Sequence, residues 1–275
     1  MSVENKDAAQ FVNAGLSYAN GLILRNSAGD PEFQIDISPG QARDSTNIFD
    51  LISTKTEIVN LQKVGFGGRL NASLDAGWYA IFILSSSLNG GLKTIAILHN
   101  ENSGLPTVPN LREGNVTYDI NRFLGWVRYI TPENTLLPFE MVDRGGNYRE
   151  IYWSQRQSLF SAIATEVFTV QTATQPFGIP PSAVLYSATI RFDNRAGVVD
   201  NSGLITFSQT APATESEYTF KLEAALGDLS EMHVVMPVNR TSGSGEIFIA
   251  GNLGVAAAVG VNVQVSQGVM VGFYL

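Results

Sequence analysis

Few residues in this sequence have the chemistry for nucleophilic catalysis. The chain contains two histidines, His99 and His233, and no cysteine, whereas a hydroxyl nucleophile needs a neighbouring base, which is usually histidine. His99 lies in a polar stretch that predicts a loop, and His233 precedes a predicted strand. Neither is accompanied by the G-x-S-x-G sequence of a nucleophile elbow. We therefore predict that the protein is not an enzyme and that both histidines are structural or solvent-exposed.

Acidic and aromatic residues are concentrated between positions 140 and 153. Glu140, Asp143 and Glu150 lie close in sequence to Tyr152 and Trp153. Glycoside hydrolysis needs two carboxylates on opposite sides of a groove, and exposed aromatic rings can stack on sugars. The same composition is ordinary for the end of an aromatic-rich strand. Two alternatives therefore stay open, namely a glycan depolymerase that uses Glu140 and Asp143, and a glycan-binding module that uses Tyr152 and Trp153.

Metal and cofactor sites are not indicated. The sequence has neither H-E-x-x-H nor a D-x-[DN]-x-[DN]-G calcium loop, and the absence of cysteine removes thiolate ligands. The segments 193–195 and 200–203 carry candidate oxygen ligands, but such clusters are typical of hairpin turns. The glycine-rich segment 65–68 lacks the spacing and the following helix of a phosphate-binding loop. We predict no metal and no cofactor.

The charge content points to self-association. Charged residues make up 15% of the 275 residues, hydrophobic residues 44%, and the net charge is −8. An acidic chain repels nucleic acid, so we expect no nucleic-acid partner. A folded chain with so few charges would expose broad apolar patches as a monomer, which favours a homo-oligomer. The charged N-terminal sequence has no apolar core of signal-peptide length, so we expect no signal peptide and synthesis in the cytoplasm.

The last 29 residues carry no charge. Glycine and amide residues interrupt this stretch, so it does not resemble a membrane-spanning helix, which needs about 20 mainly apolar residues. Residues 261–266 alternate between valine and polar residues, which predicts a strand with one buried face. We expect this end of the chain to form the subunit interface. The expected interface residues are Val255, Val261, Val263, Val265, Val269, Val271, Phe273 and Leu275.

Short apolar runs between turn sequences predict an all-β fold. Residues 1–20 are predicted to be an N-terminal attachment arm with Phe11, Leu16 and Tyr18 as its anchors. Residues 21–155 predict an antiparallel β-domain. Residues 156–275 predict a jelly-roll-like β-sandwich that serves oligomerisation. The segment Gln155 to Glu166 is compatible with either a short helix or a strand.

Five stretches resemble the structural proteins of tailed-bacteriophage virions. The first two stretches are Asn20-Gly21-Leu22 and Ile35-Asp36-Ile37-Ser38-Pro39-Gly40-Gln41-Ala42-Arg43-Asp44-Ser45-Thr46-Asn47. They are followed by the aromatic strand sequence Gly77–Phe82, by Arg122–Val127, and by Phe177–Val184 after a proline-marked joint. Together these stretches and their connections span about two-thirds of the chain.

The resemblance implies a non-enzymatic and trimeric virion component. Such proteins serve as tail fibres, baseplate or adaptor parts, or capsid decorations. On this basis we expect a homotrimer that is made in the cytoplasm of a host bacterium, belongs to the virion tail and contacts other virion proteins through its N-terminal arm. Capsid decoration or a head fibre is the alternative location. A host-glycan-binding module or depolymerase at a fibre tip is the alternative of a different functional class.

Overall fold

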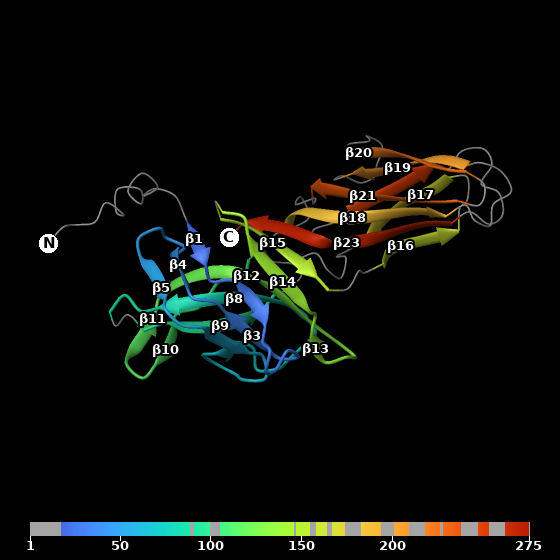
Figure 1. The fold of residues 1–275 in the computed structure, drawn as a ribbon. Helices are drawn as coiled ribbons and strands as arrows, with labels where there is room; N and C mark the ends of the chain where they lie inside the picture. Colours follow the sequence, from blue (N-terminus) through green and yellow to red (C-terminus); the bar gives the residue numbers. More distant parts are fainter. Residues whose placement is uncertain are drawn as a thin grey trace.

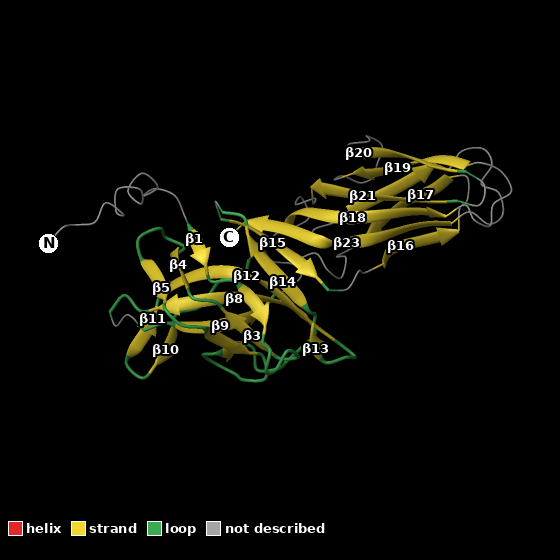
Figure 2. Ribbon diagram, viewed as in Figure 1, coloured by secondary structure: helices red, strands yellow, loops and turns green. Residues whose placement is uncertain are grey.

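The protein is an all-β protein, as the sequence predicts. The computed structural model describes residues 18–88, 91–99, 105–145, 147–154, 158–163, 167–173, 183–193, 201–208, 218–225, 228–237, 247–252 and 262–274. These residues form strands, turns and loops, and no helix occurs among them (Figure 2). The strands group into two modules that follow one another along the chain (Figure 1).

The first module contains the strands from Ala19 to Trp153. Their bounds are β1 (Ala19–Gly21), β2 (Leu24–Asn26), β3 (Gln34–Ile37), β4 (Gly40–Arg43), β5 (Asp50–Ser53), β6 (Glu57–Asn60), β7 (Gly68–Arg69), β8 (Gly77–Ser85), β9 (Lys93–Leu98), β10 (Leu111–Glu113), β11 (Val116–Tyr118), β12 (Ile120–Ile130), β13 (Thr135–Leu136), β14 (Phe139–Asp143) and β15 (Tyr148–Trp153).

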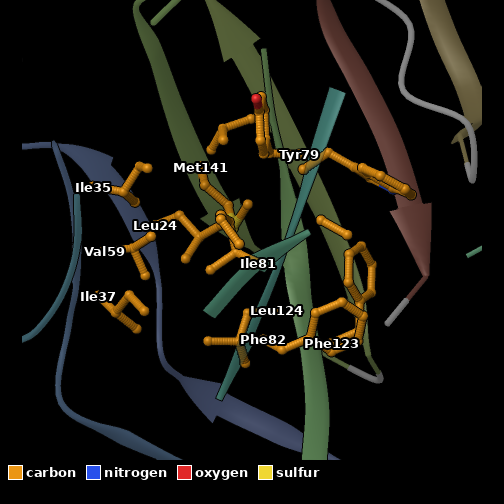
Figure 3. Close-up of a cluster of buried hydrophobic side chains, with 14 of the residues drawn as sticks. Leu24, Ile35, Ile37, Val59, Tyr79, Ile81, Phe82, Phe123, Leu124 and Met141 are labelled. Atoms are coloured by element: carbon orange, nitrogen blue, oxygen red, sulfur yellow. The ribbon is translucent and has the colours of Figure 1, made fainter. Parts of the chain in front are cut away.

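Two sheets enclose the core of the first module. One has the order β6-β3-β2-β14-β15 and the other β13-β12-β8-β9-β7. Strands β3 and β15 alternate between buried and half-buried residues, so each turns one face inward. Figure 3 shows Leu24, Ile35 and Val59 of the first sheet packed among Ile81 and Leu124 of the second. The small sheet β1-β4-β5 and the hairpin β10-β11 lie outside this pair of sheets.

A fully buried arginine joins the two sheets. Arg149 on β15 donates hydrogen bonds to the carbonyl oxygens of Leu22 (2.9 Å), Leu124 (3.0 Å) and Gly21. Gly21 and Leu22 have positive φ angles, and the pairing of β12 with β8 is irregular between Phe123 and Gly125. The guanidinium therefore satisfies carbonyls at places where the regular strand hydrogen bonding is interrupted. Burial lowers the pKa of Arg149 to about 10, so it stays charged at neutral pH.

The second module is a jelly roll. Its strands are β16 (Ser158–Ile163), β17 (Val167–Ala173), β18 (Ala183–Asp193), β19 (Asn201–Ser208), β20 (Tyr218–Ala224), β21 (Leu229–Pro237), β22 (Ile247–Asn252) and β23 (Asn262–Tyr274). They form two four-stranded sheets with the orders β16-β23-β18-β21 and β17-β22-β19-β20. In the first sheet β16, the first strand of the module, pairs with β23, the last. In the second sheet β17, the second strand, pairs with β22, the last but one. This pairing is the connectivity of a jelly roll. Of the segment for which helix and strand were alternatives, the described residues 158–163 form strand β16.

The C-terminal strand connects the two modules. The first half of β23, residues 262–266, pairs with β16, and its second half, residues 270–274, pairs with β15 of the first module. Its other edge pairs with β18 along most of its length. One sheet therefore continues from β21 through β23 and β15 to β6 (Figure 1). The predicted boundary at 155/156 lies between β15 and β16, and this sheet crosses it.

Candidate functional site

An open strand edge is present on the first module. Among the described strands, β5 pairs with β4 and with no other. The main-chain N–H of Asp44 donates to the carbonyl oxygen of Phe49 (2.9 Å) at the turn of this hairpin. Because hydrogen-bonded and non-hydrogen-bonded pairs alternate along an antiparallel ladder, the main-chain groups of Asp50 and Ile52 point away from β4. This edge has the geometry to accept a further strand.

Large apolar side chains are exposed around that edge. Ile48 is 67% exposed, Phe49 42%, Ile52 57% and Leu88 83%. We call these four residues the β5 patch. Scattered single apolar residues are normal on a protein surface, whereas a group beside one open edge is typical of an interaction site.

A cleft runs along the β5 patch. It has a volume of about 330 Å³, and its lining residues are Phe49, Asp50, Leu51, Ile52, Ser85, Ser86, Ser87, Leu88, Leu92 and Ile120. A second cleft of about 330 Å³ is lined by Ile52 and the Pro39-Gly40 segment. Ser87 donates from its N–H (3.0 Å) and its hydroxyl (2.8 Å) to the Asp119 carboxylate, and these bonds lower the pKa of Asp119. This carboxylate fixes the chain where it leaves β8 beside Leu88.

The described chain begins beside the β5 patch. The hydroxyl of Tyr18 donates to Asp50 Oδ1 (2.9 Å), which also forms an ion pair with Arg43 Nε at 3.0 Å. The Arg43 guanidinium lies over the Tyr18 ring, 5.8 Å from its centre. Burial, followed by the bond to Asp50, raises the pKa of Tyr18. Tyr18 therefore packs on its own module, and residues 19 and 20 of the predicted arm belong to β1; Phe11 and Leu16 lie outside the described residues.

The turn before the β5 patch is built on one carboxylate. Asp44 is 2% exposed, and its carboxylate accepts the N–H groups of Thr46 (3.1 Å), Ile48 (2.8 Å) and Phe49 (2.9 Å). Burial alone raises the pKa of Asp44, but a hydrogen bond from the Thr46 hydroxyl and these main-chain bonds outweigh it, so the pKa lies below its usual value. The Asp-Ser-Thr-Asn sequence thus orients Ile48 and Phe49.

We predict that Asp44→Asn destabilises the protein by about 2 kcal/mol at pH 7, because an amide accepts these hydrogen bonds less strongly than a carboxylate. The folded-state pKa is lower than the unfolded one, so the charged group contributes stability above about pH 4, and this contribution is lost as the pH falls through the folded pKa. Urea unfolding at pH 7 and pH 3 measures both effects. A wild-type advantage that stays constant down to pH 3 would contradict the assignment.

The two residues proposed for glycan contact lie on opposite faces of β15. Trp153 is 3% exposed and packs against Trp78 and Phe139, with ring centres 5.7 and 6.0 Å apart. A buried ring offers no face to a sugar, so the structure does not support Trp153 as a stacking platform. Tyr152 is half-buried on the outer face, where its hydroxyl donates to Glu150 Oε2 (2.6 Å). That bond raises the pKa of Tyr152.

The candidate hydrolytic carboxylates do not form a facing pair. Arg144 donates to Glu150 Oε2 (2.7 Å) and to the Tyr152 hydroxyl (2.9 Å), which commits this carboxylate to an ion pair. Asp143 accepts the N–H of Gly145 (2.8 Å) and so caps a turn. Glu140 is exposed on the outer face of β14. Each acidic group thus has its own local setting, and the structure brings none of them together across a cleft.

The two histidines occupy different environments. His99 is 7% exposed and lies edge-on to Trp126, with ring centres 5.5 Å apart. His233 is exposed, and its Nδ1 lies 2.9 Å from the hydroxyl of Thr189. In the part of the chain that the structure describes, no three His, Cys, Asp or Glu residues group as a metal site, and no helix is long and apolar enough to cross a membrane.

Strand β23 contains most of the predicted interface residues. Val263, Val265, Val269, Val271 and Phe273 lie on it, while Val255, Val261 and Leu275 lie outside the described residues. Both edges of β23 are paired within the chain over most of their length, so its face is the larger surface for a contact with another copy. The interface prediction stays a prediction.

Comparisons with known proteins identify no family. No family model matches the sequence, and no curated protein matches it. Among solved structures, CBM4 is 8% identical over 50% of this chain and 78% of its own, with a TM-score of 0.24. A carbohydrate-binding module of the β-sandwich superfamily is 10% identical over 94% and 98%, with a TM-score of 0.23. A chain of infectious bursal disease virus, Gx strain, is 13% identical over 94% and 70%, with a TM-score of 0.24.

Proposed function

We propose that this protein is a non-enzymatic structural component of a bacteriophage virion that assembles as a homo-oligomer, with a trimer as the expected state, and that neighbouring virion proteins bind at the β5 patch. A place in the tail follows from the sequence resemblance, and capsid decoration is the alternative location. The observation that carries the proposal is the open edge of β5, surrounded by four exposed large apolar side chains.

The chemistry of the β5 patch favours a protein partner. An extended segment that adds to a sheet edge gains main-chain hydrogen bonds, and alternate side chains enter flanking pockets. Phe49 and Leu88 border such a pocket beside Ile52. An exposed apolar edge left uncovered promotes aggregation, so a covering partner is the arrangement that keeps the chain soluble.

The second module supports an assembly role by analogy alone. Jelly rolls occur in viral capsid proteins and also in lectins, and a fold does not determine a function. The sequence resemblance to phage virion proteins favours the first of these uses. A glycan-binding role at Tyr152 and Trp153 has less support, because Trp153 is buried in the core.

We predict that Ile52→Lys reduces incorporation of the protein into phage particles by at least tenfold, because a lysine on an open edge opposes the addition of a strand. Ile58→Lys is the matched control, since Ile58 is 45% exposed on a different edge strand, β6. Particles are assembled with each variant supplied in place of the wild type, purified, and analysed by quantitative mass spectrometry.

The control should enter particles at the wild-type level. Equal incorporation of Ile52→Lys and Ile58→Lys would remove the β5 patch from the proposal. Absence of the wild-type protein from purified particles would remove the virion assignment itself. Circular dichroism and a urea unfolding curve on each variant establish that the compared proteins are folded.

A further inference from the structure

We propose that the strand added to β5 comes from a second copy of this chain, from the segment around Phe11 and Leu16, so that the copies link head to tail. This inference rests on the proposed function, because it names the neighbour that occupies the β5 patch. It assigns two sites to one interface, namely the patch as acceptor and the N-terminal segment as donor.

The acceptor is shaped for a short extended segment. The main-chain groups of Asp50 and Ile52 point away from β4, and β5 extends over only four residues, Asp50–Ser53. Side chains of an added strand would alternate between the two sides of the sheet. The cleft of about 330 Å³ that Phe49, Leu88 and Ile120 line runs along this edge and offers space for large apolar side chains on one side of the added strand.

The donor has the required composition and reach. Seventeen residues precede Tyr18, and they include Phe11, Val12 and Leu16, with Val12, Ala14 and Leu16 at alternate positions. A fully extended segment of this length spans roughly 56–61 Å, which is enough to reach a neighbouring subunit. The segment leaves from Tyr18, which is held to Asp50 at the end of the same small sheet. Donor and acceptor therefore start from one corner of the module.

The order of the strands favours a second copy over the chain's own β5. Strands β1 and β5 lie on opposite sides of β4, and both run antiparallel to it. From β1, the open edge of β5 is about three strand spacings away, or roughly 14 Å. Leu16 is only two residues from Tyr18 and reaches at most about 7 Å from it. Within one chain, Leu16 therefore cannot reach the open edge of β5, and only residues nearer the start of the segment can, whereas Phe11 and Leu16 can both pair with a neighbour.

A head-to-tail contact has consequences for symmetry. Donor and acceptor are different surfaces, so the interface is heterologous and closes into a ring when the rotation between copies permits. This agrees with the expected trimer, whose mass would be about 89 kDa for three chains of 29.7 kDa.

Two full-length variants test the inference. Phe11→Asp combined with Leu16→Asp disables the donor, and Ile52→Lys disables the acceptor. Native mass spectrometry should show wild-type oligomers, monomers for each variant alone, and a one-to-one heterodimer when the variants are mixed, because one intact donor and one intact acceptor remain. Ile58→Lys in place of Ile52→Lys should leave the wild-type oligomer intact.

Cross-linking locates the contact, because the chain has no cysteine of its own. A mixture of the single variants Leu16→Cys and Leu88→Cys should give a covalent dimer with a short bis-maleimide, and Leu16→Cys with Val64→Cys should not. A monomeric wild type, oligomers of the donor variant alone, or a link formed only within a Leu16→Cys/Leu88→Cys double variant would each overturn the inference. The particle assay with Ile52→Lys then still decides whether the β5 patch binds another virion protein.

Discussion

Arg149→Met is expected to lower the free energy of unfolding by about 4 kcal/mol. The guanidinium supplies hydrogen bonds to the carbonyls of Gly21, Leu22 and Leu124 inside the core. Methionine has a similar length but no donor, so three buried carbonyls lose their partner, and each loss costs about 1–3 kcal/mol before relaxation. Equilibrium urea unfolding followed by tryptophan fluorescence measures the effect.

Two further variants separate hydrogen bonding from charge. Arg149→Lys keeps the cation but lacks the planar fork that reaches several carbonyls at once, so it should recover only part of the stability. Arg144→Met removes an exposed arginine at the end of the same hairpin and should leave the urea midpoint near the wild-type value. Similar midpoints for Arg149→Met and Arg144→Met would show that the buried carbonyls are satisfied in another way.

The strands were predictable from the sequence where a few consecutive residues carry the pattern, as an alternation of apolar and polar side chains or as an apolar run. Alternation at 33–37 and 57–61 and the aromatic run at 78–84 correspond to β3, β6 and β8. The valine alternation at 261–266 corresponds to the start of β23. In β3 one face meets the core and the other is half-buried, so the burial pattern follows consecutive residues, whereas β8 is buried on both faces and its continuous apolar run reflects that. Hairpins between neighbouring strands follow from the same local information.

Long-range pairing was not predictable in this way. Nothing near Met270 indicates that residues 270–274 pair with β15, more than 110 positions earlier in the chain. The role of Arg149 depends equally on the carbonyls of Gly21 and Leu124, which lie 128 and 25 positions away. A positive residue in a strand sequence is normally assigned to the surface, so its burial follows only from the assembled fold.

The period of a strand did carry information about the candidate site. Adjacent strand residues point to opposite faces, so Tyr152 and Trp153 had to lie on different sides of β15. Only one of them was able to face a ligand, and Trp153, which has the larger ring, is buried in the core. The β5 patch was not predictable for a different reason: Leu51 and Ile52 are adjacent and equally apolar, and the sequence alone does not say which of the two faces the core.

Gly40→Ala is expected to destabilise the protein by about 2–3 kcal/mol, as overpacking does when the obstacle is backbone. Gly40 pairs with Gly21 between β4 and β1. An added Cβ would lie 2.5 Å from the carbonyl oxygen of Asn20 and would also overlap the N–H of Leu22. Flexible side chains can move aside, but these atoms belong to a strand whose carbonyls Arg149 holds in place.

Gly29→Ala is the matched control, because a Cβ at Gly29 meets nothing within 4 Å. It should leave the urea midpoint unchanged or raise it slightly, since alanine restricts the unfolded chain. The Pro39-Gly40 sequence is then explained by the close approach of two strands. If Gly40→Ala unfolds at the same urea concentration as Gly29→Ala, β1 is free to shift, and the rigid corner from which the N-terminal segment leaves the module does not exist.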